Sequence, residues 1–302
     1  MKPTFRPHAA LGACVLALAV FAAARPAHGQ PIGQPLRDRA YQPALEPVLD
    51  PGFARRLVYD LGAQASYPLG LARREPSRFL LGTLGISALM LSDAATYDAL
   101  ATPSWIRHDR MVGPARTLSQ LGDGTSALAL VAGFGLVGFV GGSEREKQTT
   151  MMLTEAVATS FVWTGALKFL GGRERPRDAQ EPNGDWTGPG TVFNDDGARK
   201  LHVSFPSGHS TGAWAAATIL AHQYPSHHIV PIAAYGTATA ISYSRMVVGA
   251  HWLSDVVVGG LIGYGCARQI IGAHGRPNEP SRIHVLYKPN GDEQHLGLSI
   301  AF

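Results

Sequence analysis

The stretch that decides the fold is H-V-S-F-P-S-G-H-S-T-G, residues 202–212, which runs directly into the apolar segment A-W-A-A-A-T-I-L-A. Serine and glycine at a helix start are ordinary caps, because a side-chain oxygen can accept from a backbone N–H that the first turn leaves unpaired. The same residue types also suit an anion, since free N–H groups, a hydroxyl and an imidazole would stand at the positive end of a helix dipole. The stretch alone leaves both interpretations open.

Six long apolar segments around this stretch predict helices. They cover residues 79–97, 125–142, 144–169, 210–222, 229–245 and 252–271. Glycine and alanine recur inside them, which permits close helix contacts, and S-E-R-E at residues 143–146 is a capping box that ends one helix and starts the next. The sequence therefore predicts one all-α domain, a six-helix bundle over residues 77–272.

Segments of different character flank the bundle. Residues 1–29 combine a basic start, an apolar run and A-H-G, which is typical of a cleaved export signal; a membrane anchor is the alternative. Residues 30–76 are rich in proline and arginine and predict an irregular N-terminal arm or linker, with a short amphipathic helix near 53–61. Residues 273–302 contain two strand-like runs around an Asn-Gly pair, which predicts a small C-terminal β-hairpin.

Composition narrows the class of partner. The chain of 302 residues is 45% hydrophobic and 16% charged, below the usual quarter of a soluble protein, so a membrane surface is a candidate contact. The net charge is +4 without a cluster of Lys and Arg on one face, which excludes nucleic acid as the expected partner and suits anionic substrates. Removal of residues 1–29 would leave Cys266 as the remaining cysteine and no internal disulfide. Nothing in the sequence indicates an oligomeric state.

Three segments place charged and polar side chains at predicted helix ends. They are Lys168-x6-Arg175-Pro176, Pro206-Ser207-Gly208-His209 and Ser244-Arg245-x5-His251-x3-Asp255. Lys168, Arg175 and Arg245 supply three cations, and an arginine offers a planar fork of donors that matches phosphate oxygens. Ser207 and the amides after it would add directed donors at the start of a helix. Because phosphoryl transfer depends mainly on positioning and charge neutralisation, these groups predict a phosphate site, and the motifs lack metal-ligand spacing.

His251 and Asp255 stand four residues apart and therefore lie on one face of the sixth predicted helix. A carboxylate in that place can hold one imidazole nitrogen protonated and aim the other outward, as an oriented nucleophile requires. A single His–Asp pair is more often structural, and a single cation at a helix end is usually solvated. Their joint occurrence favours the phosphate-site interpretation of the stretch at 202–212.

The three segments, in this order, resemble the tripartite signature of the type 2 phosphatidic acid phosphatase and vanadium haloperoxidase superfamily, over about residues 77–271. The resemblance implies that His251 attacks phosphorus to form a phosphohistidine and that Asp255 orients and charges it. It implies that His209 protonates the leaving oxygen and then activates water. It further implies that Lys168, Arg175, Ser207, Gly208 and Arg245 bind the phosphate. The expected activity is that of a metal-independent phosphatase, a phosphoric ester hydrolase without a cofactor, with vanadate binding as a phosphate mimic.

The expected substrate is a phosphomonoester or pyrophosphate, either a phosphorylated lipid or a small organic phosphate. One alternative is a vanadium-dependent haloperoxidase, although haloperoxidases of this superfamily tend to be considerably longer. Another is a non-catalytic envelope protein that binds anionic headgroups, which would need the cations but not His209, His251 and Asp255. The polar segment 172–205 is long enough to shape a substrate site, but it carries no readable specificity.

The order of the helices bears on location. A cleaved export signal leaves residue 30 outside the inner membrane, whereas six crossing helices with an outward-facing site would have to begin inside. Residues 30–76 are too rich in arginine and proline to supply another crossing. We therefore predict an exported bundle on the periplasmic side of the cell envelope, soluble or resting on a membrane without crossing it. An integral membrane protein with its site facing the periplasm is the alternative.

Overall fold

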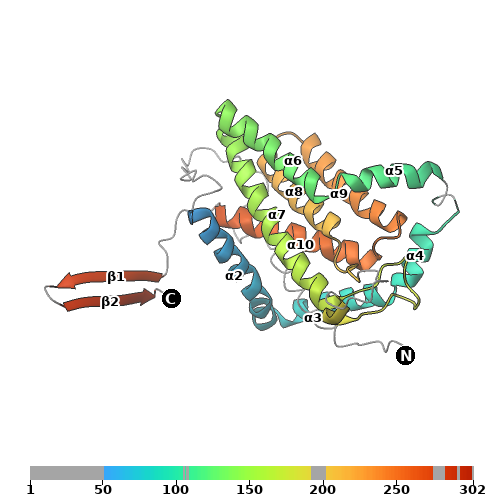
Figure 1. Cartoon of the computed structure of the whole chain (residues 1–302), viewed down its shortest axis with the longest axis horizontal. Coiled ribbons are helices and arrows are strands. Elements are labelled where there is room, and N and C mark those ends of the chain that lie inside the picture. The colour runs from blue at the N-terminus through green and yellow to red at the C-terminus, as the bar shows by residue number, and fades with distance from the viewer. Residues whose placement is uncertain are drawn as a thin grey trace.

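A computed structural model describes residues 51–104, 106, 109–191, 202–274, 283–290 and 293–300 (Figure 1). Among these residues the α-helices are α2 (Pro51–Arg74), α3 (Pro76–Leu91), α4 (Asp93–Ala101), α5 (Asp109–Gln120), α6 (Gly124–Gly135), α7 (Glu144–Gly171), α8 (Gly208–Gln223), α9 (Ile229–Val247) and α10 (Leu253–His274). A π-helical turn, η2 (Leu136–Val140), continues α6, and a 3-10 turn, η3 (Gly188–Thr191), follows α7. The strands β1 (Ile283–Asn290) and β2 (Glu293–Ile300) pair antiparallel, with Ile283 opposite Ile300.

The predicted all-α bundle is confirmed, but nine α-helices stand in the described residues where six were expected. Helices α7 to α10 match the last four predicted segments within a few residues. The single helix predicted over 79–97 is two, α3 and α4, which meet at an angle of 61°. The side chain and the backbone N–H of Ser92 both donate to Leu89 O, and Asp93 begins the new helix with its carboxylate turned into the bundle. Tertiary contacts of Asp93 therefore accompany a bend that the apolar pattern did not show.

The short helix expected near 53–61 is part of a longer helix, α2, of 24 residues, so the irregular arm predicted for residues 30–76 is wrong over 51–74. Residues 1–29 and 30–50 lie outside the described part of the chain. Helix α2 packs against α7 and α10 through buried polar groups: Gln64 Nε2 donates to Gln269 Oε1 at 2.9 Å, and Trp163 Nε1 donates to Gln64 Oε1 at 2.7 Å. Asp60 Oδ1 likewise accepts from Gln269 Nε2 at 3.0 Å. Polar residues on the buried face explain why hydrophobic periodicity revealed only a short part of this helix.

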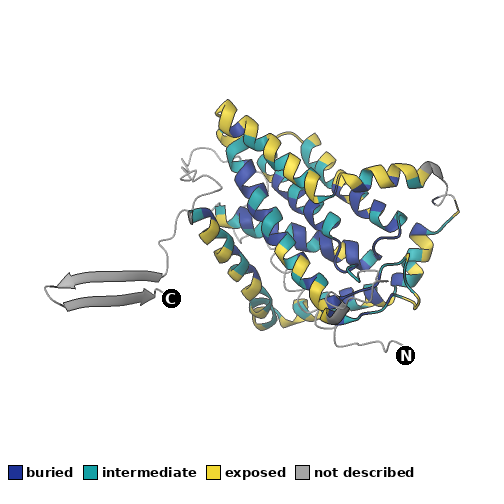
Figure 2. Ribbon diagram, viewed as in Figure 1, coloured by how far each residue is buried: buried dark blue, intermediate teal, exposed yellow. Residues whose placement is uncertain are grey.

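The core lies where α7, α8 and α10 pack together (Figure 2). Helices α8 and α10 approach so closely that a Cβ at Gly263 would lie 2.1 Å from Thr211 O, and one at Gly259 would lie 2.4 Å from Ser207 O. Real Cβ atoms do not come that near to a backbone oxygen, so these two positions require glycine. The close helix contacts expected from the glycine-rich segments are thus present, and they bring the start of α8 against the first turns of α10.

Apolar side chains also lie on the outside of the bundle, including Leu81, Leu91, Leu128, Val140 and Ile232, all exposed. By length and composition α10 could cross a membrane, and the bent pairs α3 with α4 and 111–120 with 124–140 would each qualify if counted as one span. The apolar window of α10 is 61% buried within the bundle, so this helix serves as a core element. An outer surface of this kind suits contact with a membrane.

Candidate active site

The three predicted segments meet at one end of the bundle, where α7 and α9 finish and α8 and α10 begin. Ser207 N donates to Asp255 O at 2.9 Å, which ties the start of α8 to α10. Arg245 O accepts from the backbone N–H groups of Ala250 and His251, at 3.0 and 3.3 Å, and so folds the α9–α10 loop back over the end of α9. All eight candidate residues therefore lie on helix ends or loops at the same end of the bundle.

His251 is buried in this loop, with Nδ1 3.7 Å from Asp255 Oδ2. That distance is within reach of an ion pair but too long for a hydrogen bond, and Nδ1 has no hydrogen-bond partner among the described residues. Burial, together with the charges of Lys168 and Arg245, lowers the pKa of His251 to about 3 in spite of the nearby carboxylate. The imidazole is therefore neutral at neutral pH, which is the form that can act as a nucleophile.

Asp255 is fully buried and has hydrogen bonds on both carboxylate oxygens. Its Oδ2 accepts from Ser204 Oγ at 2.6 Å and from Trp252 N at 2.8 Å, and its Oδ1 accepts from Arg173 Nη1 at 2.8 Å. Burial alone would raise the pKa of Asp255, but Arg173 and the hydrogen bonds outweigh burial and hold the pKa at about 2. A fixed negative charge thus stands beside His251.

The three cations predicted to bind phosphate influence one another's charge. Burial lowers the pKa of Lys168 to about 7, and repulsion from Arg175 and Arg245 adds to that effect while Asp255 opposes it. Burial also lowers the pKa of Arg245, to about 10, and the pKa of Arg175 in the same direction. The Nε groups of Arg175 and Arg245 are buried without a hydrogen-bond partner among the described residues. Buried donors of this kind, next to mutually repelling cations, fit an anion that would accept from them.

Helix α8 begins beside the cations with Ser207 as its N-cap. Ser207 Oγ accepts from Ser210 N at 3.4 Å, a long contact, and the first amides of a helix have no partner within the helix. His209, in the first turn, has its pKa lowered to about 4 by burial and by Arg245. A Cβ at Gly122, in the α5–α6 loop, would lie 3.3 Å from the His209 side chain, so this loop packs closely against His209.

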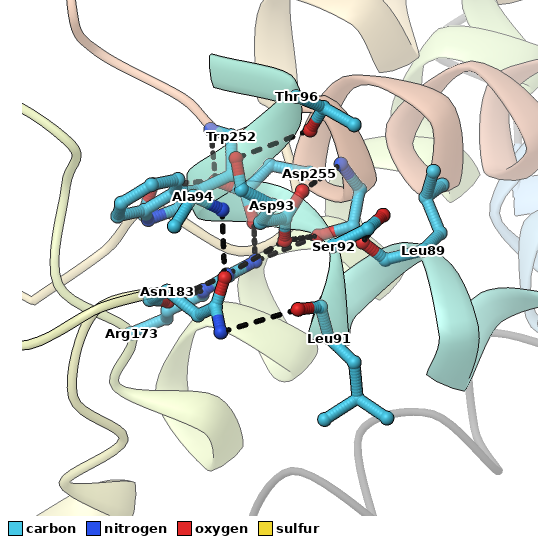
Figure 3. Close-up of polar contacts among 12 residues, drawn as sticks. Leu89, Leu91, Ser92, Asp93, Ala94, Thr96, Arg173, Asn183, Trp252 and Asp255 are labelled. Carbon is cyan, nitrogen blue, oxygen red and sulfur yellow. Dashed lines mark hydrogen bonds and ion pairs between the residues drawn. The ribbon is translucent and has the colours of Figure 1, made fainter. Parts of the chain in front are cut away.

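The structure adds residues that the sequence did not single out. Ser204 holds Asp255, Ser119 of α5 accepts from Arg245, and Val203 O accepts from Lys168 Nζ. Arg173 and Asp93 lie behind Asp255 and are described below (Figure 3). Arg173 could have been noticed in the sequence because it lies inside the Lys168-x6-Arg175 segment. No motif in the sequence pointed to Ser119 or Asp93.

The segment 172–205 therefore positions two site residues, because its Val203 O accepts from Lys168 and its Ser204 Oγ donates to Asp255. Residues 192–201 of the same segment lie outside the described part, so its expected contact with substrate stays a prediction. Within the described ranges no group of three or more His, Cys, Asp or Glu side chains could hold a metal ion.

This region is similar to proteins of a known family. Residues 149–278 match the family model of the PAP2 superfamily, which confirms the resemblance noted above; all eight candidate site residues fall within them. The lipid A 1-phosphatase of Porphyromonas gingivalis is 27% identical over 161 residues, 52% of this chain and 32% of that protein. The acid phosphatase of Zymomonas mobilis is 40% identical over 75 residues, 24% of this chain and 25% of that protein. The matches thus span about a third or less of either relative.

Among solved structures, the chain is similar to that of the first transmembrane PAP2 type phosphatidylglycerolphosphate phosphatase from Bacillus subtilis. The identity is 19%, the match covers 74% of this chain and 94% of that one, and the TM-score is 0.44.

Proposed function

Because residues 149–278 belong to the PAP2 superfamily, we propose that this protein is a phosphatase that removes phosphate from a phosphorylated lipid through a phosphohistidine. The observation that carries the proposal is the meeting of three cations with a buried, neutral His251 that an ionised Asp255 supports. The cations suit the phosphoryl group, the imidazole suits attack on it, and the carboxylate suits the charge that attack creates on the ring.

In the binding step, Lys168, Arg175, Arg245 and the start of α8 receive the phosphoryl oxygens. In the free protein, burial lowers the pKa of Lys168 to about 7, and repulsion from Arg175 and Arg245 adds to the shift. A bound dianion reverses this effect, since an opposite charge nearby favours the protonated amine. Binding of substrate therefore completes the positive charge of the site.

In the first chemical step, a ring nitrogen of His251 forms a bond to phosphorus while the bond from phosphorus to the leaving oxygen breaks. His209 gives its proton to that oxygen, and Asp255 stabilises the positive charge on the His251 ring. The free protein holds the pKa of His209 at about 4, and the phosphate dianion raises that pKa so that His209 can carry the proton. In the second step His209 removes a proton from water, the water oxygen bonds to phosphorus, and the P–N bond breaks to release inorganic phosphate and His251.

The choice of a lipid substrate rests on an apolar groove of about 510 Å³ between α8, α9 and α10. It is lined by Trp214, Thr239, Ser242, Tyr243, Met246, Leu253, Val256, Val257, Gly260, Leu261 and Tyr264. Two of its lining residues, Met246 and Val256, directly follow the site residues Arg245 and Asp255 in the chain. A volume of this size and lining is typical of sites for small apolar ligands. An amphiphile with its phosphate among the cations and a hydrocarbon chain in the groove would use both features.

Thr239→Trp tests this choice, because Thr239 lines the groove and is exposed. We expect the ratio of kcat/KM for a long-chain phosphatidate in detergent micelles to kcat/KM for p-nitrophenyl phosphate to fall about tenfold or more, since loss of chain burial removes about 1.4 kcal/mol or more. Thr237→Trp is the matched control: it is also exposed on α9 but does not line the groove. An unchanged ratio in Thr239→Trp would assign the protein to soluble phosphates, and an absence of phosphatase activity toward both substrates would refute the enzyme itself.

The location that we propose is the periplasmic side of the envelope, with the bundle in contact with a membrane that it does not cross. The exposed apolar side chains and the largely buried α10 support this arrangement. Release of the protein from membranes by a high-pH carbonate wash is the expected result. Retention together with protease-protected fragments of the bundle would show that its helices cross the bilayer.

A further inference from the structure

Arg173 is a fully buried cation of the candidate site whose guanidinium pairs with the carboxylates of Asp93 and Asp255. It stands between the end of α7 and Arg175, and its backbone is fixed by the isolated bridge with Trp186 and by Ser204 N, which donates to Arg173 O at 2.9 Å. Its guanidinium lies between the rings of Trp186 and Trp252, 5.0 and 5.2 Å from their centroids. Two aromatic rings are thus in contact distance of this cation.

All five N–H groups of Arg173 are used within the protein. Nη1 donates to Asp255 Oδ1 at 2.8 Å and to Ser254 Oγ at 2.7 Å, and Nη2 donates to Asp93 Oδ2 and Asn183 O, both at 2.7 Å. Nε donates to Asn183 O at 3.3 Å. No donor is left for a substrate, so Arg173 differs from Arg175 and Arg245, whose Nε groups have no partner among the described residues.

Asp93 is the second carboxylate on this guanidinium (Figure 3). It is fully buried; Oδ1 accepts from Ser254 N at 2.9 Å, and Oδ2 accepts from Ser254 Oγ as well as from Arg173. Asn183 fixes the start of α4 next to Asp93, because Ala94 N donates to Asn183 Oδ1 at 2.7 Å. Asp93 lies outside the residues matched to the family, so α4 contributes to the site from another part of the chain.

Burial, followed by the charge of Asp255, raises the pKa of Asp93, while Arg173 and the hydrogen bonds from Ser254 oppose that shift. With both carboxylates ionised, the charges of these groups do not cancel. One guanidinium is shared by two carboxylates, and Asp255 is the one that faces His251. If Asp93 were neutral, the guanidinium would act on Asp255 alone and reduce the field that this carboxylate exerts on the His251 ring. The hydrogen bond on Oδ1 also fixes the carboxylate plane, so that Oδ2 is held toward His251, Ser204 and Trp252.

We propose that Asp93 and Arg173 are positioning residues for the nucleophile: Arg173 aims Asp255 at His251, and Asp93 prevents Arg173 from neutralising it. The pair acts on the reaction through Asp255 and makes no contact with substrate. This inference rests on the proposed function, because it concerns the ring charge that develops when His251 attacks phosphorus. It makes the rate of the first chemical step depend on a carboxylate of α4.

The test compares Asp93→Asn with Asp60→Asn, which makes the same change at another buried aspartate, in the interface of α2 with α10. For Asp93→Asn we expect kcat to fall about 10- to 100-fold, with KM within about twofold of wild type, because phosphate binding is untouched. The acidic limb of the pH profile of kcat should move to lower pH, because a less stabilised imidazolium loses its proton more readily. Asp60→Asn should keep the wild-type kcat and limb. A purely structural role would lower thermal stability without moving the limb.

Arg173→Lys is the second variant, since it keeps the charge but offers too few donors in the wrong geometry to hold both carboxylates. If Asp93→Asn does not fold, Arg173→Lys alone tests the inference. We expect it to show the same loss in kcat, with KM unchanged. Folded variants with the kcat and acidic limb of wild type would overturn the inference. Phosphoenzyme formation by wild type is measured alongside: if wild type forms none, the proposed function fails and the inference fails with it, whereas a phosphoenzyme unaffected by the variants removes only the inference.

Discussion

Replacement of Asp255 by asparagine keeps the shape of the side chain and removes its charge from the neighbourhood of His251. The carboxylate oxygen lies 3.7 Å from Nδ1, and two unit charges at that separation interact by about 4 kcal/mol at an effective dielectric constant of about 20. The imidazolium that forms on attack loses this stabilisation, so the rate of phosphorylation should fall by on the order of 10³-fold. The cations that bind phosphate are unchanged, and KM should therefore stay close to that of wild type.

The assay is steady-state hydrolysis of p-nitrophenyl phosphate by Asp255→Asn, with far-UV circular dichroism to establish that the variant is folded. Ser204→Ala is the control, because it removes one hydrogen bond, of 2.6 Å, from the same carboxylate without changing its charge. We expect Ser204→Ala to lose about 10- to 100-fold, in line with the about 1.5–3 kcal/mol of a single hydrogen bond to a charged group, which is less than the loss expected for Asp255→Asn. A folded Asp255→Asn protein within tenfold of the wild-type kcat would refute the role assigned to this carboxylate.

Three further predictions follow from the charges of the site and of the α2 interface. Tungstate, a dianion across the neutral range, should bind more weakly as the pH rises above about 7, because free Lys168 has its pKa lowered to about 7 by burial and must take up a proton on binding; Lys168→Met should bind tungstate with a weaker pH dependence near 7 than wild type. Vanadate should inhibit by imitating five-coordinate phosphorus, and a chelator should leave activity unchanged; loss of activity in chelator that a divalent ion restores would contradict the mechanism. Burial raises the pKa of Asp60 to about 6, so the folded state favours the neutral acid, and its stability should decline as the pH rises from about 4 to about 6. Asp60→Asn, which stays neutral, should therefore be more stable than wild type above pH 6, by up to about 3 kcal/mol in urea unfolding, and parallel pH profiles of the two proteins would show that this reasoning is wrong.

The helices that the sequence predicted well are those with long, mostly apolar runs. Helices α7 to α10 are such runs, and the three charged segments lie at their ends. Because successive antiparallel helices place alternate ends at the same face of a bundle, the convergence of Lys168, Ser207 and His251 could be predicted from helix order alone.

Other elements depend on contacts that no local pattern records. The inward side of α2 carries Asp60 and Gln64. Their hydrogen-bond partners lie on α7 and α10, so these polar groups are paired only once the three helices have packed. The bend between α3 and α4 places Asp93 against Arg173, 80 residues later in the chain. A single sequence shows that Arg173 lies in a basic segment, but it does not distinguish an arginine that binds phosphate from one whose five donors are used internally.

The central claim is that phosphate passes through His251, and the most direct test is to look for it there. A phosphorus-labelled substrate is mixed with the protein for milliseconds and quenched in alkaline detergent, because the P–N bond of a phosphohistidine is hydrolysed by acid. Peptide mass spectrometry then locates the label. We predict one labelled peptide containing His251, absent from His251→Ala and longer-lived in His209→Ala, in which water is activated poorly. Turnover by wild type with no labelled histidine, or a label on another residue that persists in His251→Ala, would contradict the account.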